Sequence, residues 1–351
     1  MENVRFGLVG AGSIAGYAAK EINQFEHSEV IAATDLNETR LKALCAEHTI
    51  PNAHSDAASL FADPKVDAVY IAVPNKFHAP LAIQALEAGK HVILEKPFAL
   101  NAAEAAGVIA VARQSGKVFT VGMNQRFDAN HQKITRFSRR GELGEIYHAK
   151  AFWTRRSGIP GLGTWFGNRD LAGGGCLNDI GVHFLDLCLY AIDRFDPVSV
   201  YGATYTKFGN RGLGAGTWGI SDKTESVFDV EDFASALIRF ADGSTVALDA
   251  SWAGHQQSEE AMGVVLYGTE AGADVSAGKI FRNDPLREDY DIIENVNSDI
   301  RYKHCSRFAN FTNAILGKEE LCATHEQALA VQRILDAIQE SSRTGHEVIL
   351  S

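Results

Sequence analysis

The sequence predicts a doubly wound parallel α/β sheet over residues 1–123, followed by an α+β domain with a large, mostly antiparallel open sheet over residues 124–351. Its length of 351 residues exceeds what one hydrophobic core usually fills. Up to about Val121, short β-rich runs alternate with helical stretches, which is typical of parallel sheets. From Ile146 on, longer alternating runs indicate antiparallel strands. We therefore expect two domains.

The elements of the first domain follow from runs of β-branched residues and from helical periodicity. In such a sheet, ligands bind beyond the carboxyl ends of the strands. The expected strands are Val4–Val9, Val30–Asp35, Ala68–Val73, His91–Leu94 and Val118–Val121, and the expected helices are Ser13–Gln24, Glu38–His48, Ala57–Phe61, Phe77–Ala88 and Ala102–Ser115.

The apolar run at the N-terminus breaks into closely spaced glycines before a helical pattern begins. Gly10 allows an unusual turn, and Gly12 lets a ligand approach the main chain. Ser13 and Ile14 then begin a helix whose free N–H groups suit a diphosphate. This pattern predicts a Rossmann-type dinucleotide site, although a tight turn alone could also account for it.

Asp35 follows the second apolar run, about twenty residues after the glycines, where dinucleotide folds place the carboxylate that binds the adenosine ribose. The alternative is an ordinary cap for the helix near Glu38. A carboxylate here favours NAD over NADP, and Leu36 and Asn37 supply no compensating cation. Arg40, one turn into the next helix, has a side chain long enough to reach back toward the ribose.

Polar residues follow two further strands. Pro74, Asn75 and His78 come after the third long run, where Asn75 can cap a helix or offer its amide to a ligand. Glu95 and Lys96 directly follow the next strand. Since two charges at a strand end are costly to desolvate, a functional pair is favoured over a structural ion pair.

The second domain is predicted to be a sheet with helices on one face. Asp242 and Gly243 are expected to form a hairpin turn. The expected strands are Ile146–Thr154, Val198–Tyr205, Asp232–Phe240, Thr245–Ala253 and Gly263–Tyr267, and the covering helices are Val182–Ile192, Arg307–Leu316 and His325–Ser342.

A second chemical cluster follows the glycines at 173–175. Asp179 and His183 stand four residues apart, so on a helix both project from one face. Three interpretations compete: a helix cap with a buried histidine, an acid/base pair, and a metal site with Cys176. No further ligand cluster supports the metal, so we predict none.

Composition excludes several function classes. The formal net charge of −11 argues against nucleic-acid binding. The chain begins without a leader-like segment, and no run is expected to reach the length of a membrane span. Five scattered cysteines indicate reduced thiols. We therefore expect a cytoplasmic protein with a small-molecule substrate and no membrane partner.

Four segments together resemble the glucose–fructose oxidoreductase / inositol dehydrogenase (Gfo/Idh/MocA) family. They are the glycine turn with Asp35, Val73–His78 (VPNKFH), Ala88–Pro97 (AGKHVILEKP) and Gly122–Phe127 (GMNQRF). The glycine turn is shared by many folds, whereas the third segment is much more specific, and the resemblance covers essentially the whole chain. It implies an NAD(P)-dependent dehydrogenase that acts on CH–OH groups, and a homodimer or homotetramer formed through the C-terminal sheet.

The resemblance also implies site residues. The catalytic set would be Lys96, Asp179 and His183, with His183 as the general base, although sequence leaves open whether Lys96 takes the proton. The implied cofactor-binding residues are Gly10, Gly12, Ser13, Ile14, Asp35, Pro74, Asn75, His78, Glu95 and Lys96, and the implied substrate-binding residues are Lys96, Asn124, Arg126, Arg155, Arg156, Trp165, Asp179 and His183.

The substrate is expected to be a cyclic polyol or sugar, because amide, arginine and indole groups suit several hydroxyls. Gln125, Trp153, Asn168 and Arg169 are further candidates for the cleft. Arg155 and Arg156 before a glycine-rich loop could instead hold a sugar phosphate, such as glucose 6-phosphate, or be solvated charges. A non-catalytic NAD-binding sensor is the alternative from another class.

Overall fold

The computed structural model describes residues 2–218, 227–284, 289–293, 300–304 and 306–350. It divides into two compact units. The first contains Met1–Met123 and His304–Leu329, and the second contains Asn124–Lys303 and Ala330–Ser351. The division after residue 123 is the expected one, whereas residues 304–329, which were placed in the second domain, belong to the first unit.

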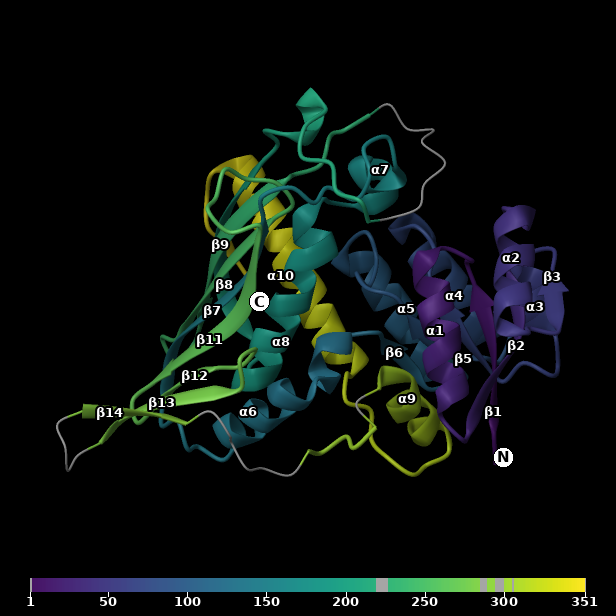
Figure 1. The fold of residues 1–351 in the computed structure, drawn as a ribbon, viewed down its shortest axis with the longest axis horizontal. Helices are drawn as coiled ribbons and strands as arrows, with labels where there is room; N and C mark the ends of the chain where they lie inside the picture. Colours follow the sequence, from purple (N-terminus) through teal and green to yellow (C-terminus); the bar gives the residue numbers. More distant parts are fainter. Residues whose placement is uncertain (1, 219–226, 285–288, 294–299, 305, 351) are drawn as a thin grey trace. The chain divides into compact units, whose positions relative to one another are not determined.

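The sheet of the first unit is six-stranded and entirely parallel (Figure 1). Its strand order reverses between β1 and β4, which is the place where doubly wound folds bind ligands. The order is β3 (Asn52–His54), β2 (Ser28–Thr34), β1 (Val4–Val9), β4 (Ala68–Ile71), β5 (His91–Leu94) and β6 (Phe119–Val121). Only β3 was not predicted, since its three residues form too short a pattern.

Helices join these strands where periodicity predicted them, with ends set by local caps. Asn37 accepts a hydrogen bond from the Arg40 N–H and so caps the second helix. The helices are α1 (Ser13–Gln24), α2 (Glu38–His48), α3 (Ala57–Ala62), α4 (His78–Glu87) and α5 (Ala102–Ser115), with a short 3₁₀ turn η1 (Asn75–Phe77) before α4.

Helix α9 (Arg307–Ile315) completes the core of the first unit. Phe308 and Phe311 are fully buried there. The Phe311 ring lies 6.1 Å from that of Phe6, and the Phe308 ring lies 5.1 Å from that of Tyr70. This apolar packing is the reason that residues 304–329 belong to the first unit.

The second unit is built on a nine-stranded sheet in which β7 and β10 are parallel and the other neighbours antiparallel. The expected hairpin at Asp242-Gly243 joins β9 and β10, and Gly243 has a φ of 89°. The order is β14 (Asp289–Ile293), β13 (Lys279–Asp284), β12 (Gly272–Asp274), β11 (Glu260–Gly268), β7 (Ile146–Arg155), β10 (Thr245–Ser251), β9 (Phe233–Phe240), β8 (Pro197–Tyr205) and β15 (Val348–Ile349).

Helices cover one face of this sheet, where Figure 1 shows α6 (Ala129–Arg139), α8 (Val182–Ile192) and α10 (His325–Thr344). Ser341 and Ser342 of α10 accept hydrogen bonds from the Gly202 and Thr204 N–H groups of β8. Shorter helical segments are η2 (Asn124–Phe127), η3 (Trp165–Gly167), α7 (Arg169–Ala172), the π-helical η4 (Leu177–Gly181) and η5 (Gly209–Arg211).

Among the residues that the structure describes, one segment is apolar and long enough to cross a membrane. By composition it is Arg169–Ile192, contrary to the expectation that no run would reach this length. The whole of its most apolar stretch is buried inside the protein. Core helices have this property, so the segment is weak support for a membrane span.

Candidate active site

The glycine turn of the first unit has the geometry of a diphosphate site. Gly10 has a φ of 102°, and a Cβ there would lie 2.2 Å from the Ala72 carbonyl oxygen, so the fold itself requires glycine. Gly12 is different, because a Cβ there would meet nothing within 4 Å. The chain therefore leaves open space next to Gly12, as close approach of a ligand requires.

Gly12 is also the N-cap of α1 and provides no side-chain cap. The first N–H groups of a helix lack intrahelical partners, and those of Ser13 and Ile14 belong to this set. No acidic residue occupies the first turn. The predicted anion site thus has donors, space and the positive end of a helix dipole.

The Asp35 carboxylate lies beside this turn. Its side chain is 11% exposed, and it accepts hydrogen bonds from the Ala11 N–H at 2.6 Å and the Asn37 N–H at 2.7 Å. Asn37, not Asp35, caps α2. The guanidinium of Arg40 lies 3.7 Å from Asp35, so the long side chain suspected from the sequence does reach this carboxylate.

His78 does not lie in open space. It is 1% exposed, and its ring nitrogens lie 2.8 Å from the Pro97 carbonyl oxygen and 2.9 Å from that of Val73. Burial lowers the pKa of this imidazole. The His78 ring thus bridges the segments that follow β4 and β5, and the expected role of His78 toward the cofactor stays a prediction. Pro74 and the buried Asn75 precede it at the end of β4.

Glu95 is held in a buried polar network at the end of β5. Its carboxylate pairs with Arg307 at 2.6 Å and accepts a 2.5 Å hydrogen bond from the Tyr70 hydroxyl. Burial raises the pKa of Glu95, but the charges of Arg307 and Lys96 outweigh it and hold the pKa below its ordinary value. Burial and the Glu95 charge raise the pKa of Tyr70 well above its usual range.

This network gives the Glu95 carboxylate partners within the protein, Tyr70 and Arg307. Its expected contact with the cofactor stays a prediction. Lys96 follows it directly, and its main-chain N–H donates to Glu95 at 3.1 Å. Sequence reasoning missed Arg307, because nothing in a lone arginine near the C-terminus indicates a partner some two hundred residues away.

In the second unit, Asp179 is fixed by a tryptophan that the sequence did not single out. The Trp252 indole N–H donates to the Asp179 carboxylate at 2.9 Å, and Trp252 is fully buried. Asp179 lies in a π-helical turn, and a π-helix takes more residues per turn than an α-helix. Asp179 and His183, which are four residues apart, are therefore separated by less than one turn. Spacing alone could not show this geometry, which recurs at functional sites.

Glu231 anchors the glycine run before that turn. Its carboxylate accepts from the Gly175 N–H at 2.7 Å and from the Leu177 N–H at 3.2 Å. Gly175 packs so tightly that a Cβ would lie 2.0 Å from the Glu231 carbonyl oxygen. Burial raises the pKa of Glu231. Gly175 must be glycine because the chain at this position passes directly over the main chain of Glu231.

His183 lies in the first turn of α8 beside an aromatic ring. The Trp153 ring centre is 5.8 Å from that of His183, and the Trp153 indole donates to Glu260 at 2.7 Å. Arg155 also binds Glu260, at 2.6 Å, and its guanidinium lies 4.6 Å from the Trp153 ring. Aromatic, cationic and anionic groups thus gather on the side of the sheet that carries His183.

Arg126, whose expected contact with substrate stays a prediction, is held inside the second unit. Its side chain is completely buried, and its guanidinium binds the Asp186 carboxylate with contacts of 2.8 Å and 2.5 Å. The Tyr190 ring lies 4.6 Å from the guanidinium. A side chain enclosed in this way holds η2 against α8, and the sequence pattern could not distinguish this role from a ligand contact.

The remaining candidates are more scattered. Arg156 is exposed and donates to the carbonyl oxygens of Gln256 and Gln257. Trp165 stacks on Phe166 at 3.9 Å. Asn168 caps α7, Arg169 donates to the Asp229 carbonyl oxygen, Asn124 is exposed and Gln125 half-buried in η2. Their roles toward substrate stay predictions.

The residues expected to be catalytic belong to different units. Lys96 belongs to the first, whereas Asp179 and His183 belong to the second. Within the described ranges, no group of three or more His, Cys, Asp or Glu side chains could hold a metal ion. Cys176 donates instead to the Ala250 carbonyl oxygen. Cys45, Cys176, Cys188 and Cys322 are free thiols, and Cys305 lies outside the described residues.

The strand order, the glycine turn and Asp35 define the first unit as a Rossmann-type dinucleotide-binding domain. Family models agree: an NAD-binding Rossmann oxidoreductase family matches residues 4–123, and the GFO/IDH/MocA C-terminal domain matches residues 131–274. The chain belongs to the GFO/IDH/MocA family, and it is an NAD-dependent oxidoreductase.

Several relatives are sugar or polyol dehydrogenases. The chain is 31% identical to D-glucoside 3-dehydrogenase of Escherichia coli over 99% of its own length and 97% of the relative. It is 26% identical to myo-inositol 2-dehydrogenase of Thermotoga maritima over 71% and 68%. A levoglucosan dehydrogenase solved with NADH and levoglucosan has the same fold, with a TM-score of 0.83, 21% identity and 99% coverage of both chains.

Proposed function

We propose that this protein transfers a hydride between NAD and a ring hydroxyl of a free sugar, glycoside or inositol. The observation that carries the proposal is the group formed by His183, Trp153 and Arg155 in the second unit. A flat indole face beside a titratable imidazole suits a polyhydroxylated ring that must lose a proton. The similarity to a D-glucoside 3-dehydrogenase over nearly the whole chain supports this substrate class.

NAD, when bound, accepts the hydride. His183 would take the proton from the reacting hydroxyl, because an imidazole titrates near neutral pH. Lys96 would donate a hydrogen bond to the reacting oxygen and stabilise its negative charge. Asp179, oriented by the Trp252 N–H, would bind a neighbouring hydroxyl. Asn124 and Trp165 would contact other parts of the sugar.

A free sugar is favoured over a sugar phosphate. Arg155 is already paired with Glu260, whose carboxylate would repel a phosphate group. The nearby arginine, Arg156, donates to main-chain oxygens. If either arginine nevertheless held a phosphate, replacing it by alanine would raise KM for the phosphorylated substrate far more than for the free sugar.

A substrate panel tests the function directly. We expect NAD reduction with alkyl glucosides, glucose or myo-inositol, with a lower kcat/KM for glucose 6-phosphate and for NADP. Lys96→Met and His183→Ala should each lower kcat by several orders of magnitude and leave NAD affinity nearly unchanged. Saturable NAD binding without turnover of any compound would instead favour an NAD sensor.

We further propose that the uncovered face of the nine-stranded sheet joins two copies of the chain into a homodimer or homotetramer. Tyr201 and Leu237 are direct neighbours on β8 and β9 and are 55% and 43% exposed. Tyr205, on the same face of β8, is 45% exposed. Clustered apolar side chains of this kind mark interfaces. A Tyr201→Glu variant should elute as a smaller species in size-exclusion chromatography.

The cytoplasm is the proposed location. Four free cysteines, three of them buried, suit a reducing compartment. A small-molecule substrate without a nucleic-acid or membrane partner fits the net charge of −11. Cell fractionation of the native protein tests this location.

A further inference from the structure

Glu260 on β11 holds two side chains of the group that is proposed to bind the sugar. Its Oε1 oxygen lies 2.7 Å from the Trp153 indole nitrogen and 2.6 Å from the Arg155 Nε. Both N–H groups therefore donate to one carboxylate oxygen. The Arg155 guanidinium also lies 4.6 Å from the centre of the Trp153 ring. The three side chains thus form a closed triangle in which each contacts the other two.

The register of the sheet accounts for only part of this triangle. Glu260 lies directly opposite Arg155, whereas Trp153 lies directly opposite Met262. A cross-strand pair of opposite charges is an ordinary way to stabilise a sheet. That explanation covers the contact between Glu260 and Arg155. It does not cover the indole N–H, which reaches diagonally across the two strands to the same oxygen.

The triangle lies on the face of the sheet that α8 covers. Side chains along a strand alternate between the two faces, and Ala151, on the same face as Trp153, is buried. The Trp153 ring centre lies 5.4 Å from that of Phe184 and 5.8 Å from that of His183, both in the first turn of α8. The indole is therefore held between α8 and Glu260.

The Glu260 carboxylate is a charged acceptor at neutral pH. Its side chain is 38% exposed. Burial raises the pKa of Glu260, but the hydrogen bonds from Trp153 and Arg155 outweigh it and hold the pKa below its ordinary value. Hydrogen bonds to a charged acceptor are stronger than those to a neutral one. Glu260 is thus well suited to fix the orientation of the indole.

We propose that Glu260 is a positioning residue for the sugar and acts through the Trp153 ring. This role rests on the proposed function, in which the indole face beside His183 binds the sugar. An indole whose orientation is already fixed loses less conformational freedom when a sugar ring stacks on it. The gain is made in binding and not in the hydride step, so the loss of Glu260 should raise KM more than it lowers kcat.

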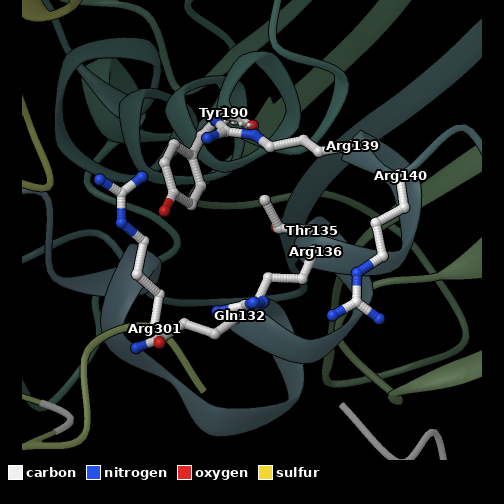
Figure 2. A pocket seen from close by; sticks show the side chains of 7 residues that line it. All are labelled: Gln132, Thr135, Arg136, Arg139, Arg140, Tyr190 and Arg301. Carbon is white, nitrogen blue, oxygen red and sulfur yellow. Dashed lines mark hydrogen bonds between the residues drawn. The ribbon is translucent and has the colours of Figure 1, made fainter. Parts of the chain in front are cut away.

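A similar arrangement elsewhere in the second unit provides a matched control. The Arg139 guanidinium lies 4.3 Å from the Tyr190 ring centre and 3.1 Å from the Asp193 carboxylate. Figure 2 shows Arg139 and Tyr190 beside a hollow of about 380 Å³. Tyr190 follows His183 by seven residues, or about 10 Å of helix. This arginine, ring and carboxylate therefore lie away from the proposed catalytic group.

Steady-state kinetics test the proposal with glucose, an alkyl glucoside or myo-inositol, whichever the unmodified protein oxidises with the highest kcat/KM. Glu260→Ala should raise the KM for that compound about tenfold, lower kcat less than about threefold and leave the KM for NAD unchanged. Glu260→Gln keeps an oxygen acceptor for the indole, so its KM should stay within about threefold of the unmodified value. Asp193→Asn is the control and should change neither constant.

A double variant shows whether Glu260 acts through Trp153. Trp153→Phe removes the indole N–H and should itself raise the KM for sugar. Adding Glu260→Ala to Trp153→Phe should then change KM little, because the contact that Glu260 makes with the indole is already absent. Two independent roles would instead give effects on KM that multiply.

The proposal is overturned if Glu260→Ala leaves the KM for sugar unchanged, even where its Tm falls, because the residue then has only a structural role. It is also overturned if Glu260→Gln loses as much as Glu260→Ala, or if the effects of Trp153→Phe and Glu260→Ala multiply. A different result, no oxidation of any sugar or polyol by the unmodified protein, would overturn the proposed function and this role with it.

Discussion

Replacing Arg307 by methionine should destabilise the first unit far more than removal of an exposed charge. Its guanidinium pairs with Glu95 at 2.6 Å and donates to the Gly122 carbonyl oxygen at 2.9 Å. Both side chains of the ion pair are only 10% exposed. Methionine keeps much of the apolar volume, so the change mainly leaves a buried carboxylate without its cation.

Breaking a buried ion pair by removing one partner costs about 3–5 kcal/mol. Glu95 retains the Tyr70 hydrogen bond, which places the expected loss near the lower end, about 3 kcal/mol. For a unit of roughly 150 residues this loss lowers the Tm by about 6–12 °C. Thermal unfolding with and without NAD measures it, because NAD raises the transition of the unit that binds it.

The loss should depend on pH. In the unmodified protein the charge of Arg307 overcomes burial and holds the pKa of Glu95 below its ordinary value. Without that charge, burial dominates, and the pKa of Glu95 rises above its value in the unfolded chain. The free energy of unfolding of the variant then falls as pH rises through that pKa. The difference in stability between the variant and the unmodified protein therefore shrinks on acidification from pH 7 to about pH 5.

A surface pair provides the matched control. Arg113 lies 3.0 Å from Glu326 in the same unit, but both side chains are more than half exposed, so Arg113→Met should cost less than about 1 kcal/mol. The double variant Glu95→Gln/Arg307→Met should recover part of the loss. If Arg307→Met costs no more than Arg113→Met, or if its deficit does not change with pH, the buried pair does not have the energetic role assigned to it.

Three further predictions concern the site and the sheet. Trp252→Phe, which removes the N–H donor of Asp179, should lower kcat/KM for sugar at least tenfold and leave the KM for NAD unchanged; a parallel loss for NAD would contradict it. Asp35→Ser should raise the NADP to NAD ratio of kcat/KM about tenfold, because Arg40 remains and the repelling carboxylate is gone; an unchanged ratio would remove Asp35 from cofactor selection. The Nδ1 of His91 accepts a hydrogen bond from the Val118 N–H, and burial lowers the pKa of His91 to about 4. The protein should therefore become less stable as pH falls from about 6.5 to 4. His91→Gln should remove this part of the dependence of stability on pH.

Much of the first unit could be predicted from local sequence. The strand Val4–Val9, the glycine turn and helix Ser13–Gln24 follow from apolar runs, permissive glycines and helical periodicity, all of which act over short distances. The hairpin at Asp242-Gly243 is local in the same way. The family resemblance likewise rested on short motifs at strand ends.

What each side chain does at those positions was decided by the tertiary structure. Sequence motifs grouped Arg126, His78 and Glu95 with ligand-binding residues, but all three are buried against partners of the protein itself. Their partners Asp186, Pro97 and Arg307 lie 60, 19 and about two hundred residues further along the chain. The sequence around a polar residue at a strand end is the same whether its side chain faces a ligand or the core.

The same limit explains the residues that sequence analysis missed. Trp252, Glu231 and Arg307 act through hydrogen bonds between segments far apart in the chain, and nothing in their own neighbourhoods marks them. The amino-acid order by itself determined where strands, turns and helices form, because those depend on neighbouring residues. Only packing decided which charges became buried pairs, because a desolvated charge must find a partner wherever the fold brings one.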